Sequence, residues 1–135
     1  MAKETGLGQT ALNVDDASGT PRDIRNDVNS WDFSTPYAMQ DVTGVDKSAS
    51  ERLALLADLT GNLNAIFNPA TNRAHAVFSG DLRVVRTIGF TISGQSLSAE
   101  CYLTDYAVNR AAGGEFTAKV PFVLQDGTVP DWTAA

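Results

Sequence analysis

The fold of this chain is set by residues 41–67, which read DVTGVDKSASERLALLADLTGNLNAIF. The last part of this stretch, Leu59–Phe67, alternates between two faces. Its apolar face carries Leu63, Ala65 and Phe67, and its polar face carries Thr60, Asn62 and Asn64. A period of two residues is typical of a half-buried strand. We therefore predict a strand here with one face in the core and the other in water.

An earlier segment, Val28–Thr35, follows the same alternation. Its apolar face carries Trp31 and Phe33, and its polar face carries Ser30, Asp32 and Ser34. Pro36 then interrupts the strand, because proline has no N–H group to donate to a neighbouring strand. We expect a bulge, a bend or an edge position at Pro36, with pairing resumed toward Val42.

Between these two strands, residues 44–56 predict an ordered arm that contains a short helix. Ser48 and Glu51 have the spacing of a capping box, and Leu53 and Leu56 follow at helical spacing. The leucines are too apolar for a free loop, so we expect the arm to bury them against another subunit. The residues expected to act in this way are Asp46, Lys47, Glu51, Arg52, Leu53, Leu55 and Leu56.

The rest of the chain predicts further strands and one helix. Alternation predicts strands over Gln9–Val14, Val84–Ser93, Leu97–Thr104 and Phe116–Leu124, and Gly94-Gln95 predicts a tight turn with glycine first. Asn68 can cap a helix over Pro69–Phe78, whose apolar stripe should lie flat on a sheet. The expected fold is mainly β (β-rich α+β), an antiparallel β-sandwich or partly closed barrel with one packed α-helix.

Length and composition bound the interpretation. The chain has 135 residues, which fits a flexible N-terminal arm at 1–8 and a single β domain at 9–135. Hydrophobic content of 43% with 19% charged residues is typical of a globular protein, and no apolar run is long enough to cross a membrane. The N-terminal residues lack an apolar signal core, so we expect synthesis and use in a cytoplasm.

The charge distribution argues against a protein whose function is to bind nucleic acid through its phosphates. The net charge is −6, and the ten basic residues are scattered along the chain. Two interpretations of the acidic residues stay open at this point. They give simple solubility, or they form a surface that repels a polyanion.

The residues suited to catalysis or metal binding form no recognisable site. His75 is the only histidine, so a His/Cys zinc site is not expected, and no G-x-S-x-G turn presents a nucleophile. Cys101 falls in the apolar phase of a strand and is expected in the core. Asp32 with Glu100, or Asp41 with Asp105, would form a glycosidase pair only if folding joined them. We therefore predict no enzyme, with no catalytic residue, metal or cofactor.

Several of these segments together resemble the tail tube proteins (major tail proteins) of long non-contractile-tailed bacteriophages. Sequences of that family often run "DVT", a loop, and then a strand of the type L-x-G-x-hydrophobic that ends in Phe-Asn or Phe-Asp. Here these parts read Asp41-Val42-Thr43, Leu59-Thr60-Gly61-Asn62-Leu63 and Phe67-Asn68. The resemblance continues through the expected helix and C-terminal strands to a closing segment at 126–132, DGTVPDW. It covers most of the chain from Leu12 onward.

The resemblance implies a structural virion protein, made in the host cytoplasm and located in the tail. Such subunits form hexameric rings that stack into a tube, which conducts DNA without binding it specifically and has no membrane role. Tape-measure and tail-terminator proteins are the further partners implied, and the loop between the first two inner strands reaches the adjoining ring. The polar faces would line the lumen, with Ser30, Asp32, Ser34, Thr60, Asn62, Asn64, Ser98, Glu100 and Thr104.

Three alternatives remain at the level of sequence. One is a related tube or connector subunit of another tail or of a secretion device. The second is a monomeric carbohydrate- or ligand-binding β-sandwich, for which Trp132 and Tyr37 are candidate exposed anchors. The third is a hydrolase that uses paired carboxylates.

Overall fold

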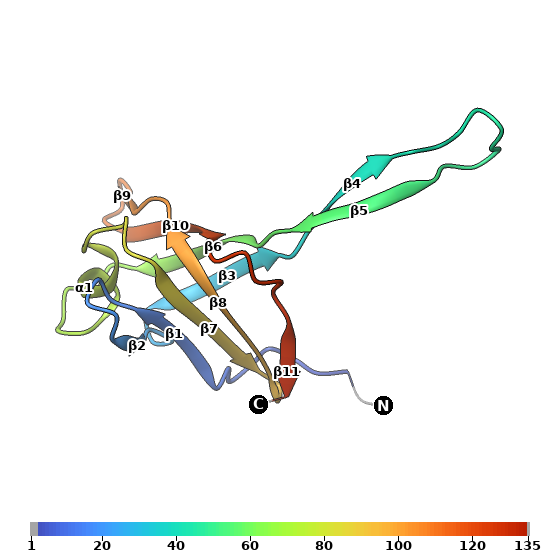
Figure 1. Ribbon diagram of the computed structural model, residues 1–135. Helices are drawn as coiled ribbons and strands as arrows, with labels where there is room; N and C mark the ends of the chain where they lie inside the picture. The colour runs from blue at the N-terminus through green and yellow to red at the C-terminus, as the bar shows by residue number, and fades with distance from the viewer. Residues whose placement is uncertain (1–2, 135) are drawn as a thin grey trace.

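A computed structural model of the protein describes residues 3–134. Within these residues, nine strands form one antiparallel sheet that folds into two layers, and a two-stranded hairpin projects from it (Figure 1). The first layer contains β3 (Val28–Ser34), β6 (Thr60–Ile66), β10 (Phe116–Leu124) and β9 (Ala107–Arg110). The second contains β2 (Pro21–Asp23), β1 (Ala11–Asp15), β7 (Arg86–Ile92), β8 (Gln95–Leu103) and β11 (Trp132–Ala134). The predicted fold class is confirmed.

The pairing registers of β6 with β3 and β10 divide the side chains of the first layer between two faces, as the alternation predicts. Trp31 lies opposite Leu63, and Asp32 lies opposite Asn62, so that apolar residues face apolar residues and polar residues face polar ones. On the other side of β6, Asn62 lies opposite Pro121 and Leu63 opposite Val120. Because side chains alternate strictly along a strand, this register gives the layer one buried face and one accessible face.

Aromatic rings fill the core between the layers. Phe90 of β7 lies 5.0 Å from Phe33 and 4.6 Å from Trp31, measured between ring centroids. Phe122 of β10 lies 6.1 Å from Phe90. Cys101, predicted as a core residue, is fully buried. Phe67, also predicted as core, is only half-buried, because it follows the end of β6 and stacks on the exposed Phe116.

The helix α1 is shorter than predicted and covers only Ala74–Phe78. Figure 1 shows it at the end of the body away from the hairpin, not along a sheet face. Its first turn is held by a residue distant in sequence, because the buried carboxylate of Asp27 accepts hydrogen bonds from the Ala74 N–H at 3.0 Å and the Asn68 side chain at 2.7 Å. Asn68 itself receives the Ala70 N–H, so the chain from Pro69 to Arg73 forms turns instead of helix.

Arg86 is fully buried next to the other end of α1. Its guanidinium donates to the carbonyl oxygens of Val77 at 2.7 Å, Asp81 at 2.9 Å and Asp15 at 3.1 Å. Burial lowers the pKa of this group, and the nearby carboxylates of Asp16, Asp15 and Asp81 act in the opposite direction. One side chain thus ties β1, α1 and the loop before β7 together.

The segment predicted to contain a helix is instead a β-hairpin, formed by β4 (Tyr37–Asp41) and β5 (Arg52–Ala57). The helix prediction is wrong for a physical reason. A helix over residues 48–57 would be shorter than an isolated helix needs to be stable, and it would have no surface of its own chain to cover. Pairing with β4 satisfies the same backbone groups. Pro36 marks the bend between β3 and β4, as predicted, and its carbonyl accepts the Asp58 N–H at 2.9 Å.

Two further details differ from the prediction. The turn between β7 and β8 is Ser93-Gly94, not Gly94-Gln95, and both residues have positive φ (50° and 76°), which defines a type I′ turn. The short strands β2, β9 and β11 were not predicted, because strands of three or four residues give too little alternation to recognise. In the N-terminal segment, the Thr5 carbonyl accepts a hydrogen bond from Ser93, while residues 1–2 lie outside the described part.

Candidate functional site

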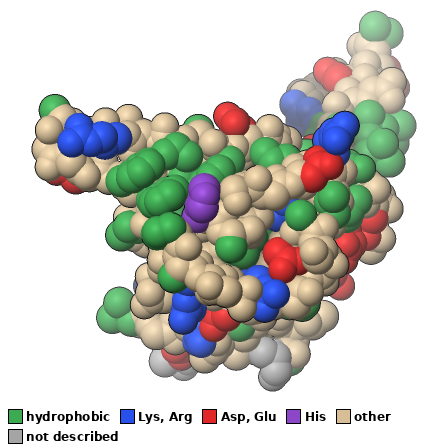
Figure 2. Space-filling model, turned by 90° about the vertical axis from the view of Figure 1, so that its left-hand side faces the viewer, with side chains coloured by type: hydrophobic (Ala, Val, Ile, Leu, Met, Phe, Trp, Pro, Cys, Tyr) green, Lys and Arg blue, Asp and Glu red, His purple; other side chains and the backbone are tan. Residues whose placement is uncertain are grey.

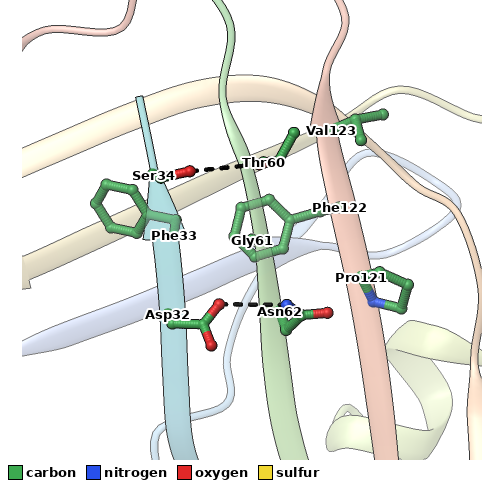
Figure 3. Close-up of a pocket in the computed structure, with 9 residues that line it drawn as sticks. All are labelled: Asp32, Phe33, Ser34, Thr60, Gly61, Asn62, Pro121, Phe122 and Val123. Atoms are coloured by element: carbon green, nitrogen blue, oxygen red, sulfur yellow. Dashed lines mark hydrogen bonds between the residues drawn. The ribbon is translucent and has the colours of Figure 1, made fainter. Parts of the chain in front are cut away.

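Six of the nine residues predicted to line a lumen form one polar patch on β3 and β6. The Asn62 side chain donates to the Asp32 carboxylate at 3.2 Å, and Asn64 donates to the Ser30 hydroxyl at 3.0 Å. The hydroxyl groups of Ser34 and Thr60 lie 3.5 Å apart. Figure 3 shows the Asp32–Asn62 and Ser34–Thr60 pairs on neighbouring strands. Each pair fixes one polar side chain of β3 against one of β6, so that the patch is ordered before any partner binds.

A shallow hollow lies in this patch over Gly61, between the side chains of Asp32, Thr60 and Pro121. Gly61 lies opposite Phe33 on one side and Phe122 on the other, in the apolar phase of the strands (Figure 3). A Cβ atom at Gly61 would collide with the Asp32 carbonyl oxygen and approach both aromatic side chains to 2.6 Å. Glycine is therefore required where the two aromatic side chains close over β6.

The same sheet face continues onto β10. Lys119 lies opposite Asn64, and Pro121 lies opposite Asn62. Asp32 and Lys119 are thus charged groups of opposite sign on a face that otherwise carries mainly hydroxyl and amide groups. The patch on β3, β6 and β10 is polar and close to neutral, which is the surface chemistry expected of a wall that does not attract phosphate.

The structure places the other three predicted lumen residues elsewhere. Ser98 and Glu100 lie on β8, and Thr104 follows its end. β10 separates all three from the patch on β3 and β6. Glu100 is occupied by a hydrogen bond from the Thr87 hydroxyl at 2.6 Å, on the far side of β8 from β10. The structure therefore joins six of the nine residues into one patch, and the role of all nine stays a prediction.

The hairpin β4–β5, which we call the arm (residues 37–57), carries the predicted inter-ring residues on an exposed surface. Asp46, Lys47, Glu51, Arg52, Leu53, Leu55 and Leu56 are all exposed. Leu56 retains 85% of its accessible surface and Val45 is completely accessible. Apolar side chains exposed in such number on one projecting element are rare in a monomer and indicate a contact surface.

Polar bonds brace the outer end of the arm. The Thr43 hydroxyl donates to the Asp41 carboxylate at 2.6 Å and accepts the Glu51 N–H at 2.7 Å, and the Val42 N–H donates to the Glu51 carbonyl. The hydrogen bonds from Thr43 lower the pKa of Asp41, which keeps this carboxylate charged. The arm is therefore an ordered structure as far as Thr43 and Glu51, although it stands clear of the body (Figure 1).

The candidate acid pairs do not meet. Asp32 on β3 and Glu100 on β8 are separated by β6 and β10, or three strand spacings of about 4.8 Å each, which is more than a glycosidase pair spans. Asp41 lies on the arm, and Asp105 lies beside β9 at the opposite end of the molecule (Figure 1).

Within residues 3–134, no three His, Cys, Asp or Glu residues cluster as metal ligands. No helix within the described part of the chain is long and apolar enough to cross a membrane.

The lone cysteine and the lone histidine both have structural surroundings. Burial raises the pKa of the Cys101 thiol to about 12, and the charges of Glu100 and Asp126 act in the same direction. His75 lies 3.1 Å from the Tyr106 hydroxyl through its Nδ1 atom, and its ring packs 4.7 Å from Phe67. The two candidate sugar-binding anchors are also separated, with Tyr37 on the arm and Trp132 packed 5.8 Å from Phe33.

Comparison with known proteins identifies the fold. No family model and no curated protein sequence matches the chain. Among solved structures, the chain is similar to a chain in the tail of an empty gene transfer agent particle with C6 symmetry, with a TM-score of 0.71 and 15% sequence identity over 98% of this chain and 100% of the other. It is also similar to a chain in the virion of a native gene transfer agent particle, with a TM-score of 0.64 and 12% identity over the same shares. The chain has the fold of these virion components over almost its whole length.

Proposed function

We propose that this protein is a structural tail tube subunit that assembles into hexameric rings, which stack into a tube for DNA. The observation that carries the proposal is the likeness in fold to a chain of a C6-symmetric tail over 98% of the sequence. The layer β9-β10-β6-β3, the polar patch and the arm supply the parts that such a tube requires. Tape-measure and terminator proteins are the further partners we expect at the lumen and at the end of the tube.

The two edges of the first layer support closure into a ring. Within the described residues, β3 pairs only with β6, and β9 pairs only with β10, so each presents an unpaired edge. All pairs are antiparallel, so that β3 and β9, three strands apart, run in opposite directions. In a ring of identically oriented subunits, β3 of one copy therefore meets β9 of the next as an antiparallel pair. Such pairing removes both exposed edges, which isolated sheets otherwise must protect.

The accessible face of this layer would then line the lumen. The buried face packs on the second layer, so the face with Asp32, Asn62 and Asn64 is free to point toward the axis. The side chains of Asn62 and Asn64 already donate to Asp32 and Ser30, so they offer few free donors to phosphate. The charge of Asp32 balances that of Lys119. DNA would pass such a wall without the counterion release that drives tight binding.

The arm would join one ring to the next. It projects beyond the body along the direction of β3 and β6 (Figure 1), and its apolar side chains Met39, Leu53 and Leu56 retain half or more of their accessible surface. A subunit in the adjoining ring supplies the missing surface in this proposal.

Negative-stain electron microscopy of the purified protein tests the proposal. We expect rings, or tubes of stacked rings, and sixfold symmetry in end-on class averages. A protein that stays monomeric at all concentrations up to the millimolar range, by light scattering as well as by microscopy, contradicts it.

A further inference from the structure

The end of the body opposite the arm carries a second exposed apolar surface. There, four rings form a continuous row. Phe116 stacks on Phe67 at 4.3 Å, Phe67 packs on His75 at 4.7 Å, and His75 lies 5.9 Å from Tyr106. Val108 lies on β9, two residues beyond Tyr106. We call these five residues the end patch.

The end patch is partly exposed, although the row leads into the core: Phe67, His75 and Tyr106 are half-buried. Tyr106 lies 5.7 Å from the buried Phe78, which anchors the inner end of the row. Phe116, at the outer end of the row, retains 40% of its accessible surface, and Val108 on the neighbouring strand β9 retains 45%. Figure 2 views the molecule from this end, and apolar side chains gather there beside the single histidine. Rigid aromatic rings on a buried base form the kind of surface that binds a partner with little loss of conformational freedom.

The arm and the end patch lie at opposite ends of the same strand. The arm returns to the body just before Thr60, the first residue of β6, and Phe67 follows Ile66, its last residue. In subunits stacked along the strand direction, the arm of one copy therefore points at the end patch of the next. A contact between two different surfaces of one chain repeats without closing, which is the geometry of a growing tube and not of a dimer.

Charge supports the same pairing. The ion pairs within residues 3–134 are Arg22–Asp16, Arg25–Asp23, Lys47–Asp46 and Arg83–Asp81. Arg110 and Glu51 take part in none of them, and both are exposed. Arg110 lies opposite Phe116 in the β9–β10 register, at the rim of the end patch, and Glu51 lies at the outer end of the arm. Arg52 on the arm and Glu115 beside Phe116 are also exposed and outside these ion pairs. Among the charges of the two surfaces, Glu51 and Arg110 thus have opposite signs and are free to pair.

We infer that the end patch is the receptor for the arm of a second copy of this chain, in which Val42, Val45 and Leu53 pack on Phe116 and Val108, and Glu51 pairs with Arg110. This inference rests on the proposed function for the stacking direction, and it adds the surface and the residues that accept the arm.

A charge exchange tests the contact. We expect Glu51→Arg and Arg110→Glu each to reduce the mean tube length in micrographs at least tenfold, and the double variant to recover most of it. Asp131→Arg, an exposed acid near neither surface, is the matched control and should assemble normally. Single variants that form tubes of normal length, or a double variant no better than either single one, overturn the pairing of these two charges.

Cross-linking tests the apolar part independently. The variant Leu53→Cys, Val108→Cys should form a ladder of disulfide-linked multimers under mild oxidation. The variant Leu53→Cys, Val129→Cys should not, because Val129 is more exposed than Val108 but lies outside the end patch. The buried Cys101 does not interfere. Tubes without this ladder overturn the inferred contact and leave the proposed function in place. The ladder without tubes or rings retains the contact and overturns the proposed function.

Discussion

Arg86 is the side chain on which the packing around α1 depends most. It fills a fully buried position and donates to three carbonyl oxygens from three segments. Without it, the buried Val77 carbonyl would be left unsatisfied, and the partly buried carbonyls of Asp15 and Asp81 would lose their partner. Leaving a buried acceptor unsatisfied costs more than the loss of the bond alone. The guanidinium therefore acts as a structural centre of the fold and not as a binding group.

We predict that Arg86→Met lowers the free energy of unfolding by about 3 kcal/mol or more, because methionine fills the volume but satisfies none of the carbonyls. Arg83→Met is the matched control. Arg83 makes an ion pair with Asp81 at the surface, and such pairs contribute at most about 1 kcal/mol. Urea denaturation followed by circular dichroism measures both. Equal stability of the two variants would contradict the role given to Arg86.

Cys101 gives a second prediction at this scale. Because the folded protein holds the thiol pKa at about 12, almost no thiolate is present at pH 8. We expect no alkylation by iodoacetamide in the native protein over hours and complete alkylation in denaturant, measured by mass spectrometry. Rapid labelling of native protein would show that β8 opens locally.

Single residues also show where sequence reasoning reached its limit. Arg86 shares the phase of Ile88 and Phe90 in its strand, which favours burial, but nothing in the sequence indicates which carbonyls surround it. Asp27 was not singled out, because it caps a helix 47 residues away and no local pattern marks such a cap. Contacts between distant segments determine both roles.

Among the elements, the row Phe33–Gly61–Phe122 fixes how closely β3, β6 and β10 approach each other. We predict that Gly61→Ala lowers the free energy of unfolding by about 2 kcal/mol, a typical result of overpacking. Gly89→Ala in β7 is the matched control, since an added Cβ there meets no atom within 4 Å. That variant should be as stable as the parent or slightly more stable, because alanine has less freedom in the unfolded chain. Thermal unfolding distinguishes the two, and equal midpoints would contradict the crowding described at Gly61.

The arm should be separable from the body. The Asp58 N–H already bonds to the Pro36 carbonyl, so replacing residues 37–57 by Asn-Gly joins two backbone positions that are hydrogen-bonded in the parent. We predict a folded body whose thermal midpoint lies within a few degrees of the parent, and no stacked tubes in electron microscopy. Unfolding of this variant would show that the arm belongs to the core, and long tubes would show that stacking does not need it.

Prediction from sequence succeeded for long elements and failed for the arm. The strands β3, β6, β7, β8 and β10 alternate over seven or more residues, and a signal of that length outweighs local exceptions. The capping-box spacing at Ser48 is a local signal, and a local signal cannot reveal that β4 lies alongside. The polar patch on β3 and β6 followed from strand phase alone, whereas the position of β8 relative to it required the topology.

For the whole molecule, the composition of the inner wall should determine how DNA behaves inside a tube. We predict that Asp32→Lys leaves tubes intact but makes them retain linear duplex DNA, because each patch would gain a positive charge on the same face as Lys119. Co-sedimentation should show binding at 50 mM salt that weakens steeply by 200 mM. Asp131→Lys changes the same charge outside the patch and should bind far less. Equal binding by both variants would contradict the assignment of this face to the lumen.

The junction at Pro36 has a mechanical consequence. The sheet of the body ends at Ser34 and Thr60, and the hairpin resumes at Tyr37 and Ala57, so that the interstrand hydrogen bond between Asp58 and Pro36 bridges the two. A tube that curves must lengthen on its outer side and shorten on its inner side, and its rings must still remain joined. A narrow link of this kind lets each arm tilt by a different angle relative to its own body, while the outer end of the arm remains bound to the adjoining ring. Bending stiffness would then reside in the eleven free backbone angles at residues 34–36 and 57–59, since the proline ring fixes φ at Pro36. Replacement of Pro36 by a residue that extends the ladder would make the whole filament straighter.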